Sequence, residues 1–230
     1  MELSIDTSTR HASVGLSNEG QSRAEITWRS ERNHSVELVP AIRRLMSHSC
    51  SDLKKVKAIF VAKGPGGFSA LRVGMSSAKA LAVALHIPLV AIGSLDIEAQ
   101  PYLGIGKPVT VIVNAGRDRF YLGIYSDATD FGSVSYDIVN FTQLVSKVKA
   151  NSVLCGEGIH SIAERLKEYH GHSSLICDVP PPTRRQSVLS HLAYLRLMAN
   201  DTDNPASIEP IYIRSAQVDT AQQAWTRHQS

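Results

Sequence analysis

The chain has 230 residues, of which 43% are hydrophobic and 20% charged, and this composition excludes disordered, collagen-like and low-complexity proteins. The formal net charge of +3 is too small to argue for a nucleic-acid partner by itself. The longest uncharged run, residues 80–95, contains Pro88 and is shorter than the ~20 apolar residues of a membrane span, so no membrane contact is expected. Because the three cysteines form no CxxC pair and the N-terminus has no signal-peptide pattern, we expect a cytoplasmic protein.

Apolar and polar residues follow one another in segments typical of an α/β protein. In the first half we expect a hairpin around Asp6, strands at 26–30, 58–62 and 88–92, and helices at 35–48 and 70–86. In the second half we expect strands at 109–113, 120–125, 134–139 and 152–155, and helices at 142–149 and 159–169. A stiff proline-rich segment at 178–183 then leads to a last helix at 187–199. The tail from 201 has a strand-like piece at 211–213, and we expect the polar residues after it to be loosely ordered.

The two halves open alike. Residues 3–6 (LSID) align with 111–114 (VIVN), and at the same offset of 108 residues 14–16 (VGL) align with 122–124 (LGI). A two-copy repeat of this kind indicates a duplicated domain, although any two hairpins resemble each other over short windows. The order of elements predicts two α/β lobes, residues 1–104 and residues 105–230, the second of which carries the last helix and the tail.

Two segments are candidates for binding a phosphate or nucleotide. Asp6, Thr7 and Ser8 close the first strand with a carboxylate and hydroxyls that could face a phosphate or hydrated Mg²⁺, although the same residue types dominate ordinary turns. Gly66 and Gly67 belong to a glycine-rich turn that enters a helix at about residue 69, and free amides at a helix N-terminus suit an anion. This turn is neither a Walker A loop nor a GxGxxG fingerprint, and a tight turn that packs a helix onto the sheet explains it equally well.

Metal-dependent and nucleophilic hydrolysis are both disfavoured. None of the nine histidines pairs with another at the i, i+4 spacing of a helical metal site, so no metal site is expected. The chain has no GxSxG elbow, and none of its cysteines has a histidine neighbour in the sequence. The sequence therefore offers no catalytic residue and no cofactor.

Several motifs together closely resemble the TsaB family, once called YeaZ. They are residues 3–9 (LSIDTST), 12–16 (ASVGL), 34–42 (HSVELVPAI) and 64–74 (GPGGFSALRVG), with further matches at 114–121 (NAGRDRFY) and 210–214 (PIYIR). Gly67, Ser69 and Ala70 stand where the family more often has Ser, Thr and Gly. Asn114 replaces its usual Asp, which removes a carboxylate from the cleft.

The resemblance implies a duplicated ASKHA fold, which is actin-like, sugar-kinase-like and RNase H-like and agrees with the repeat. It also implies a non-catalytic role in forming N6-threonylcarbamoyladenosine next to the anticodon of tRNAs. The implied partners are the related catalytic subunit TsaD and the ATPase TsaE, while TsaC supplies the threonylcarbamoyl-adenylate. Contact with tRNA would then be indirect, through the complex. The older description of the family as M22 peptidases reflects its fold rather than its function.

Two helices have more apolar surface than one core face requires. The helix at 35–48 spreads its apolar side chains over an arc of roughly 160°, wider than the ~100° stripe of one packed face, and the helix at 70–86 is rich in small residues. We therefore expect a partner, or a second copy of the chain when the partner is absent, to contact Leu38, Ile42, Leu45, Met46, Gly74, Ala78 and Ala82. The alternative is that the protein's own second lobe covers both helices.

Two other functions stay open. A small ASKHA-type kinase or ATPase is suggested by Asp6 and the glycine-rich turn, but the matching second hairpin has Asn114-Ala-Gly-Arg and the chain has no glycine triplet. A metallopeptidase would need ligand spacing that the sequence lacks.

Overall fold

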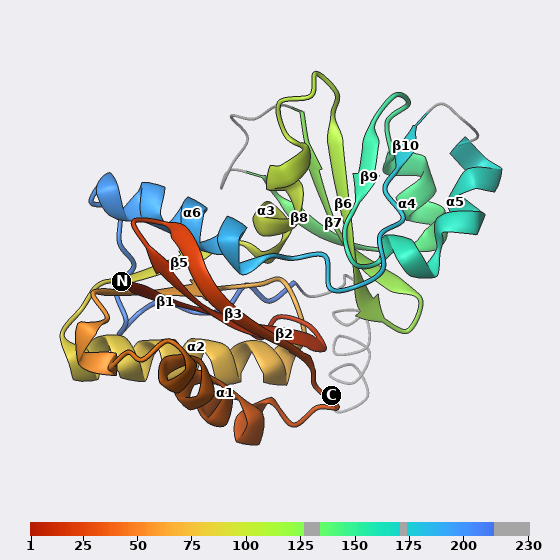
Figure 1. Cartoon of the computed structure of the whole chain (residues 1–230). Coiled ribbons are helices and arrows are strands. Elements are labelled where there is room, and N and C mark those ends of the chain that lie inside the picture. Colours follow the sequence, from red (N-terminus) through yellow and green to blue (C-terminus); the bar gives the residue numbers. More distant parts are fainter. Residues whose placement is uncertain (127–133, 171–173, 214–230) are drawn as a thin grey trace, which may run out of the picture.

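The computed structural model describes residues 1–126, 134–170 and 174–213, and it contains two five-stranded sheets (Figure 1). The first sheet has the order β3-β2-β1-β4-β5. Its strands are β1 (Glu2–Asp6), β2 (His11–Asn18), β3 (Gln21–Arg29), β4 (Ala58–Ala62) and β5 (Leu89–Ile92). The second sheet has the order β10-β9-β6-β7-β8. Its strands are β6 (Val109–Gly116), β7 (Arg119–Tyr125), β8 (Tyr136–Asn140), β9 (Val153–Cys155) and β10 (Leu175–Ile176).

The predicted duplication is confirmed, because the two sheets have the same topology. β1, β2 and β3 pair antiparallel and β1, β4 and β5 pair parallel, and β6 to β10 repeat this pattern in the same sequence order. The strands at the centre of the first sheet, β1 and β4, are buried throughout, whereas the edge strand β3 alternates between exposed and half-buried residues. A central strand covered on both faces favours apolar residues on both, as in the run AIFVA of β4. The buried polar residues of β1, Glu2, Ser4 and Asp6, are hydrogen-bonded instead.

Helices cover both faces of each sheet. α1 (His34–His48) and α2 (Phe68–Leu85) pack on one face of the first sheet, and α4 (Phe141–Lys147) and α5 (Ala163–His170) occupy the equivalent face of the second. Two further helices are α3 (Ser94–Ala99), which the sequence did not predict, and α6 (Gln186–Met198). Short 3-10 turns lie at Leu53–Lys55, Gln100–Tyr102 and Ile159–Ser161.

α3 and α6 each pack on the sheet of the other half. α6 covers Phe60, Val90 and Ile92 of the first sheet, while Leu95 and Ala99 of α3 pack against β6 and β9 in the second. Figure 1 shows α6 on the opposite side of the first sheet from α1 and α2. The predicted boundary at residue 104 therefore separates the two sheets, but the placement of α6 in the second lobe is corrected: it completes the core of the first.

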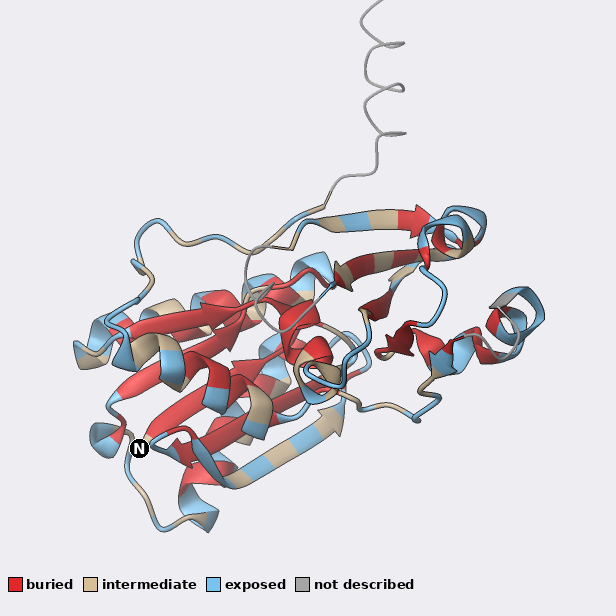
Figure 2. Cartoon of the chain, turned by 90° about the horizontal axis from the view of Figure 1, so that it is seen from above, coloured by how far each residue is buried: buried red, intermediate tan, exposed pale blue. Residues whose placement is uncertain are grey.

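The side chains predicted to contact a partner are buried inside the first lobe. Leu38, Ile42, Leu45, Met46, Gly74, Ala78 and Ala82 all lie between the helices and the sheet. The prediction that they are available at the surface is wrong, because both the sheet and the neighbouring helix cover the wide apolar arc. Figure 2 shows the same distribution, with buried residues along the strands and exposed residues on the outer faces of the helices.

The segment after α6 is held against the first lobe. The backbone N–H of Ile211 donates to the carbonyl of Lys63 (2.7 Å), and Lys79 of α2 donates to the carbonyl of Ile208 (3.1 Å). Asp203 forms an isolated bridge with Leu89. Residues 211–213 form no strand, which corrects the strand-like piece expected there. The polar residues after 213, which were expected to be loosely ordered, lie outside the described residues.

One helix within the described residues, α2, is long and apolar enough to span a membrane. It packs against β4 and β1, and Leu71, Met75 and Ala78 are buried there. The core of the first lobe thus accounts for its apolar character.

Candidate functional site

A cleft of about 1010 Å³ lies between the two lobes. The first lobe contributes the β1–β2 turn (8–11) and the start of α2 (67–70), and the second contributes the end of β6 (113–116) and Glu157. α2 begins at Phe68, with Gly67 at its N-cap, rather than at the predicted Ser69. The glycines of this turn permit a close approach, because a Cβ on Gly66 would lie 2.2 Å from the carbonyl oxygen of Ser8.

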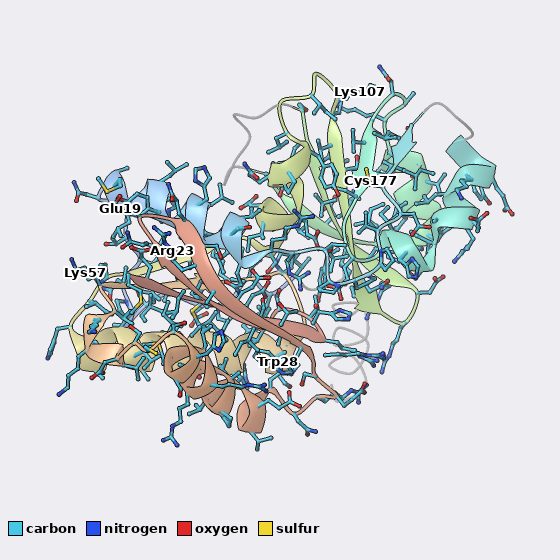
Figure 3. All side chains as sticks on the ribbon, viewed as in Figure 1. Glu19, Arg23, Trp28, Lys57, Lys107 and Cys177 are labelled. Carbon is cyan, nitrogen blue, oxygen red and sulfur yellow. The ribbon has the colours of Figure 1, made fainter. Side chains whose placement is uncertain are left out.

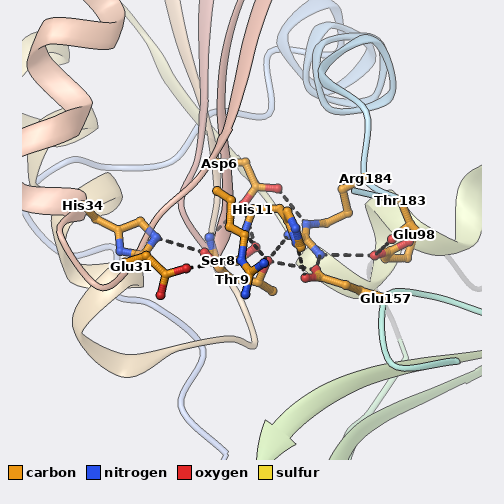
Figure 4. A network of polar contacts seen from close by, with 11 residues as sticks. Asp6, Ser8, Thr9, His11, Glu31, His34, Glu98, Glu157, Thr183 and Arg184 are labelled. Carbon is orange, nitrogen blue, oxygen red and sulfur yellow. Dashed lines mark hydrogen bonds and ion pairs between the residues drawn. The ribbon is translucent and has the colours of Figure 1, made fainter. Parts of the chain in front are cut away.

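A buried guanidinium, that of Arg184, contacts Thr9 and Glu157 of the cleft lining (Figure 4). Arg184 donates from Nε to Asp6 Oδ2 (2.8 Å) and from Nη1 to both Glu157 Oε2 (2.8 Å) and Glu98 Oε1 (3.1 Å). Its Nη2 donates to Thr9 Oγ1 (2.7 Å). These groups come from the end of β1, from the turn after β9, from α3 and from the segment before α6. One arginine therefore connects the two lobes. It also links α3 to the segment before α6, and α3 and α6 are the two helices that each pack on the sheet of the other half.

The charges in this network perturb one another strongly. Burial opposes the charged form of Glu157, but Arg184, His11 and Thr9 outweigh burial and lower the pKa of its carboxyl. For Glu98 burial prevails over the attraction of Arg184 and raises the pKa. Burial also disfavours the charged guanidinium, yet the three carboxylates around Arg184 raise its pKa. Arg184 is therefore charged, and Glu157 is the carboxylate best adapted to face it as an anion.

The predicted phosphate-binding residues lie at this site, but the side chains of Asp6, Thr7 and Ser8 already form hydrogen bonds within the protein. Asp6 accepts hydrogen bonds from Arg184 and from the backbone N–H (2.8 Å) and hydroxyl (2.5 Å) of Ser8. Thr7 donates to the carbonyl of Ala70 (2.7 Å). Asp6 and Thr7 are almost fully buried and do not line the cleft. Ser8 and Gly67 are among the residues that line it. Asp6 therefore holds an arginine, and this contact occupies the carboxylate that was a candidate ligand of phosphate or hydrated Mg²⁺.

Sequence reasoning did not identify Glu98, Glu157, Thr183 or Arg184. Thr183 Oγ1 donates to Glu98 Oε1 (2.6 Å), which further satisfies that buried carboxylate. A useful signal was present: Arg184 follows directly on the rigid proline-rich segment, so its backbone is well positioned. Its partners are far away in the sequence, however, and only the duplicated topology brings them together.

Two histidines lie along the same cleft. His11 Nδ1 is 2.7 Å from Glu157 Oε1, and His34 Nε2 is 3.0 Å from the carbonyl oxygen of Thr9. Within the described residues no group of three or more histidine, cysteine, aspartate or glutamate side chains is arranged to hold a metal ion. The second hairpin brings Asn114 to the cleft, where its amide oxygen accepts a long hydrogen bond from Ser161 (3.4 Å).

Comparison with known proteins places this architecture in a family. A family model described as tRNA N6-adenosine threonylcarbamoyltransferase matches residues 25–188. The tRNA threonylcarbamoyladenosine biosynthesis protein TsaB of Bacillus subtilis is 34% identical over 123 residues, which cover 54% of each chain. The Haemophilus influenzae protein of the same name is 25% identical over 93% of each chain.

Solved structures agree in fold. YeaZ from Pseudomonas aeruginosa superposes with a TM-score of 0.73 at 24% identity, covering 92% of this chain and 99% of that one. An activator of 2-hydroxyisocaproyl-CoA dehydratase from Clostridium difficile, solved with bound ADPNP, gives a TM-score of 0.53 at 10% identity and covers 91% of this chain and 98% of that one. The actin-like ASKHA fold predicted from the sequence is therefore confirmed. The chain belongs to the threonylcarbamoyltransferase family described by the matching model and, within it, to the TsaB (YeaZ) group.

Proposed function

We propose that this chain is a non-catalytic subunit in the formation of N6-threonylcarbamoyladenosine next to the anticodon of tRNAs. It supports a TsaD-type catalytic subunit and works with a TsaE-type ATPase in the cytoplasm. The names of its relatives support the pathway. The main support for the non-catalytic role is Arg184, which forms an ion pair with the Asp6 carboxylate at the end of β1.

A small ATPase or kinase is the competing function. The fold is shared with an activator solved with bound ADPNP, and Asp6 would be the natural carboxylate to hold a hydrated cation. In this chain a fixed positive charge lies within 2.8 Å of that carboxylate, and a cation placed there would be repelled. A cleft whose strand-end carboxylate is neutralised in this way favours a supporting role over phosphoryl transfer.

The genetic test measures the modification itself. We expect that deletion of the gene abolishes N6-threonylcarbamoyladenosine in total tRNA, as measured by mass spectrometry of nucleosides. The purified chain alone should hydrolyse no ATP. Normal levels of the modified nucleoside in the deletion strain would refute the proposed function. ATP hydrolysis by the pure chain would favour the competing function, a small ATPase or kinase.

The partner surface is proposed on the outer faces of α1 and α2. The outer face of α1 exposes Val36 and Val39, which are 69% and 50% exposed. That of α2 exposes Val83 and the small residues Ser76, Ala80 and Ala84. Small residues let the backbones of two helices approach closely, and the valines provide apolar contact area. This surface could also pair with a second copy of the chain when the partner is absent.

The surface is tested by Ala80→Glu, which places a charge on the outer face of α2 without entering the core. We expect it to weaken both the complex with the TsaD-type subunit and the homodimer by tenfold or more, measured by analytical ultracentrifugation. Ala150→Glu, at an exposed alanine of the second lobe, is the matched control. If Ala80→Glu and Ala150→Glu bind the TsaD-type subunit with equal affinity, the interface does not include the outer face of α2.

A further inference from the structure

The cleft is lined by positive charge on the side of the first lobe. Arg10, Arg29 and Arg32 are exposed and line it, and His34 lies beside them. Glu157 is the only carboxylate among the described lining residues, and it is already bound by Arg184 and His11. Arg29 also approaches the exposed Glu31 (3.4 Å), but an ion pair this exposed is worth little. The cleft therefore presents exposed arginine side chains that an anion can reach.

An exposed aromatic ring borders the same cleft. Phe68, at the start of α2, is 53% exposed and lines the cleft. Two neighbours hold its ring: the Arg72 guanidinium lies 3.9 Å from its centroid, and the Tyr212 ring lies 4.8 Å away. Arg72 Nε also donates to the Tyr212 hydroxyl (3.0 Å), so the described part of the tail supports this position. A large apolar ring fixed in place yet half exposed is suited to stack on a planar ligand.

We propose that this cleft binds a single-stranded segment of RNA, with phosphodiester groups on Arg10, Arg29 and Arg32 and a base stacked on Phe68. The inference rests on the proposed function, in which the substrate is an RNA, and adds that this chain contacts the RNA directly. Arginines beside an exposed aromatic ring are the usual combination for unpaired nucleic acid, because the former neutralise phosphates and the latter stacks on a base of any type. Unpaired loops are also the parts of RNA whose bases are free to stack on a protein.

A magnesium nucleotide fits the cleft less well than RNA does. The carboxylate that would hold its cation, Asp6, is paired with Arg184. The arginines belong to the β1–β2 turn, the end of β3 and the turn before α1. These segments lie next to one another, because His11 pairs with Arg29 and the backbone N–H of Ser30 donates to the carbonyl of Arg10 (2.7 Å).

The test uses the full chain and a fluorescein-labelled, nine-nucleotide single-stranded RNA, with binding followed by fluorescence anisotropy. We expect Arg29→Ala and Arg32→Ala each to weaken binding by about tenfold and to lower the slope of log K against log salt by about 0.7. Phe68→Ala should weaken binding by about fivefold or more with no change in that slope. Circular dichroism confirms the folding of each variant.

Arg23→Ala is the matched control. Arg23 is exposed on the same strand as Arg29, roughly 20 Å away along it, and does not line the cleft; Figure 3 shows its side chain. We expect it to leave RNA affinity within twofold of the unmodified chain. Equal losses for Arg23→Ala and Arg29→Ala would mean non-specific attraction and would overturn the proposal. So would the absence of RNA binding, or displacement of the RNA by ATP at concentrations that a mononucleotide site would require.

The two proposals fail separately. If the deletion strain keeps its modified tRNA, the proposed function is wrong whatever the RNA affinity. If the deletion removes the modification but Arg29→Ala and Arg32→Ala together leave both RNA affinity and modification unchanged, only the cleft proposal is wrong. Supported by both experiments, the cleft would be an RNA-holding surface of the complex.

Discussion

At the scale of single residues, the network around Arg184 decides what the cleft can do. Three carboxylates surround one guanidinium, and Asp6, Glu98 and Arg184 are almost fully buried. A buried charge is tolerated only when it is paired and hydrogen-bonded, so each member depends on the others. Arg184 is therefore the residue whose loss should be felt most.

Arg184→Met tests this dependence. The substitution keeps much of the apolar stem but leaves Asp6 and Glu157 without their cation. We expect the free energy of unfolding to fall by about 3–5 kcal/mol, because removing one partner of a buried ion pair strands the other. Urea denaturation followed by circular dichroism measures the loss.

The neighbouring exposed arginine provides the control. Arg185→Met removes the same charge from the adjacent, exposed position and should change the free energy of unfolding by less than about 0.5 kcal/mol. Equal losses for the two variants would show that the charge of the segment, rather than the buried network, stabilises the fold.

We predict that the contributions of Glu157 and Glu98 to the free energy of unfolding change with pH in opposite directions. The folded pKa of Glu157 lies below its ordinary value of 4.5, so its stabilising contribution is present above pH 4.5 and is lost as the pH falls through the lowered pKa. We therefore expect Glu157→Gln to cost about 1–3 kcal/mol near neutral pH and progressively less below pH 4.5. Thermal unfolding of both proteins over a range of pH checks this difference.

Glu98→Gln serves as the comparison for Glu157→Gln. Its folded pKa is raised, so its favourable contribution is present below its ordinary value of 4.5 and is lost as the pH rises through the raised pKa. The stability difference between the unmodified chain and Glu98→Gln should thus change with pH in the opposite direction. Parallel profiles for the two variants would contradict the assignment.

The sequence predicted the position of the site better than its chemistry. Asp6, Ser8 and Gly67 were correctly placed at the end of β1 and the start of α2, because strand ends and glycine turns are local features. The partner of Asp6 could not be predicted in the same way. Arg184 is far away in the sequence, and no local pattern shows which distant side chain forms an ion pair with a carboxylate at the end of a strand.

At the scale of elements, α6 crosses closely over the first sheet, and a glycine makes this possible. A Cβ on Gly15 of β2 would lie 2.8 Å from Ser4 Oγ and 2.9 Å from Gln186 Cβ, so glycine is required for α6 to approach. Gln186 at the start of α6 also donates to Ser13 Oγ (2.8 Å), which fixes the helix at that point. The lack of a side chain at Gly15 in β2 thus allows α6, a helix from the other half of the chain, to lie at this distance.

Gly15→Ala should push α6 away from β2. We expect a loss of about 1–3 kcal/mol in the free energy of unfolding, the usual cost of an extra methyl group in a packed core. Urea denaturation measures it. Gly67→Ala is the control, since its added Cβ would meet no atom closer than 3.7 Å. An unchanged stability for Gly15→Ala would mean that α6 can shift without cost.

Most helices and strands were predictable because their apolar periodicity is local, and the offset of 108 residues revealed the repeat. The errors came from packing between elements. A helical wheel shows that α1 has a wide apolar arc, but it cannot show whether a sheet and a neighbouring helix share that arc. Leu38 and Met46 were therefore assigned to a partner although they belong to the core.

At the scale of the whole molecule, the two halves cannot be separated by cutting between the sheets. Phe60, Val90 and Ile92 are buried beneath α6, although α6 lies in the second half of the chain. Fully burying a side chain of this kind contributes roughly 1.5–3 kcal/mol. Residues 1–104 alone would therefore expose an apolar face that the complete chain covers.

The last prediction follows from this exchange of helices. We expect residues 1–104 to show no cooperative urea transition, because an exposed apolar face of that kind promotes association rather than folding. Joining them through a flexible Gly/Ser linker to residues 184–213, which contain α6 and the described tail, should restore a cooperative transition and the circular dichroism of a packed α/β protein. A cooperative transition of residues 1–104 by themselves would contradict the prediction, since it would mean that the first sheet is stable with one face uncovered. The first sheet and α6 then form one cooperative unit, although α6 lies in the second half of the chain, and the helices that close each lobe also hold the two walls of the cleft together.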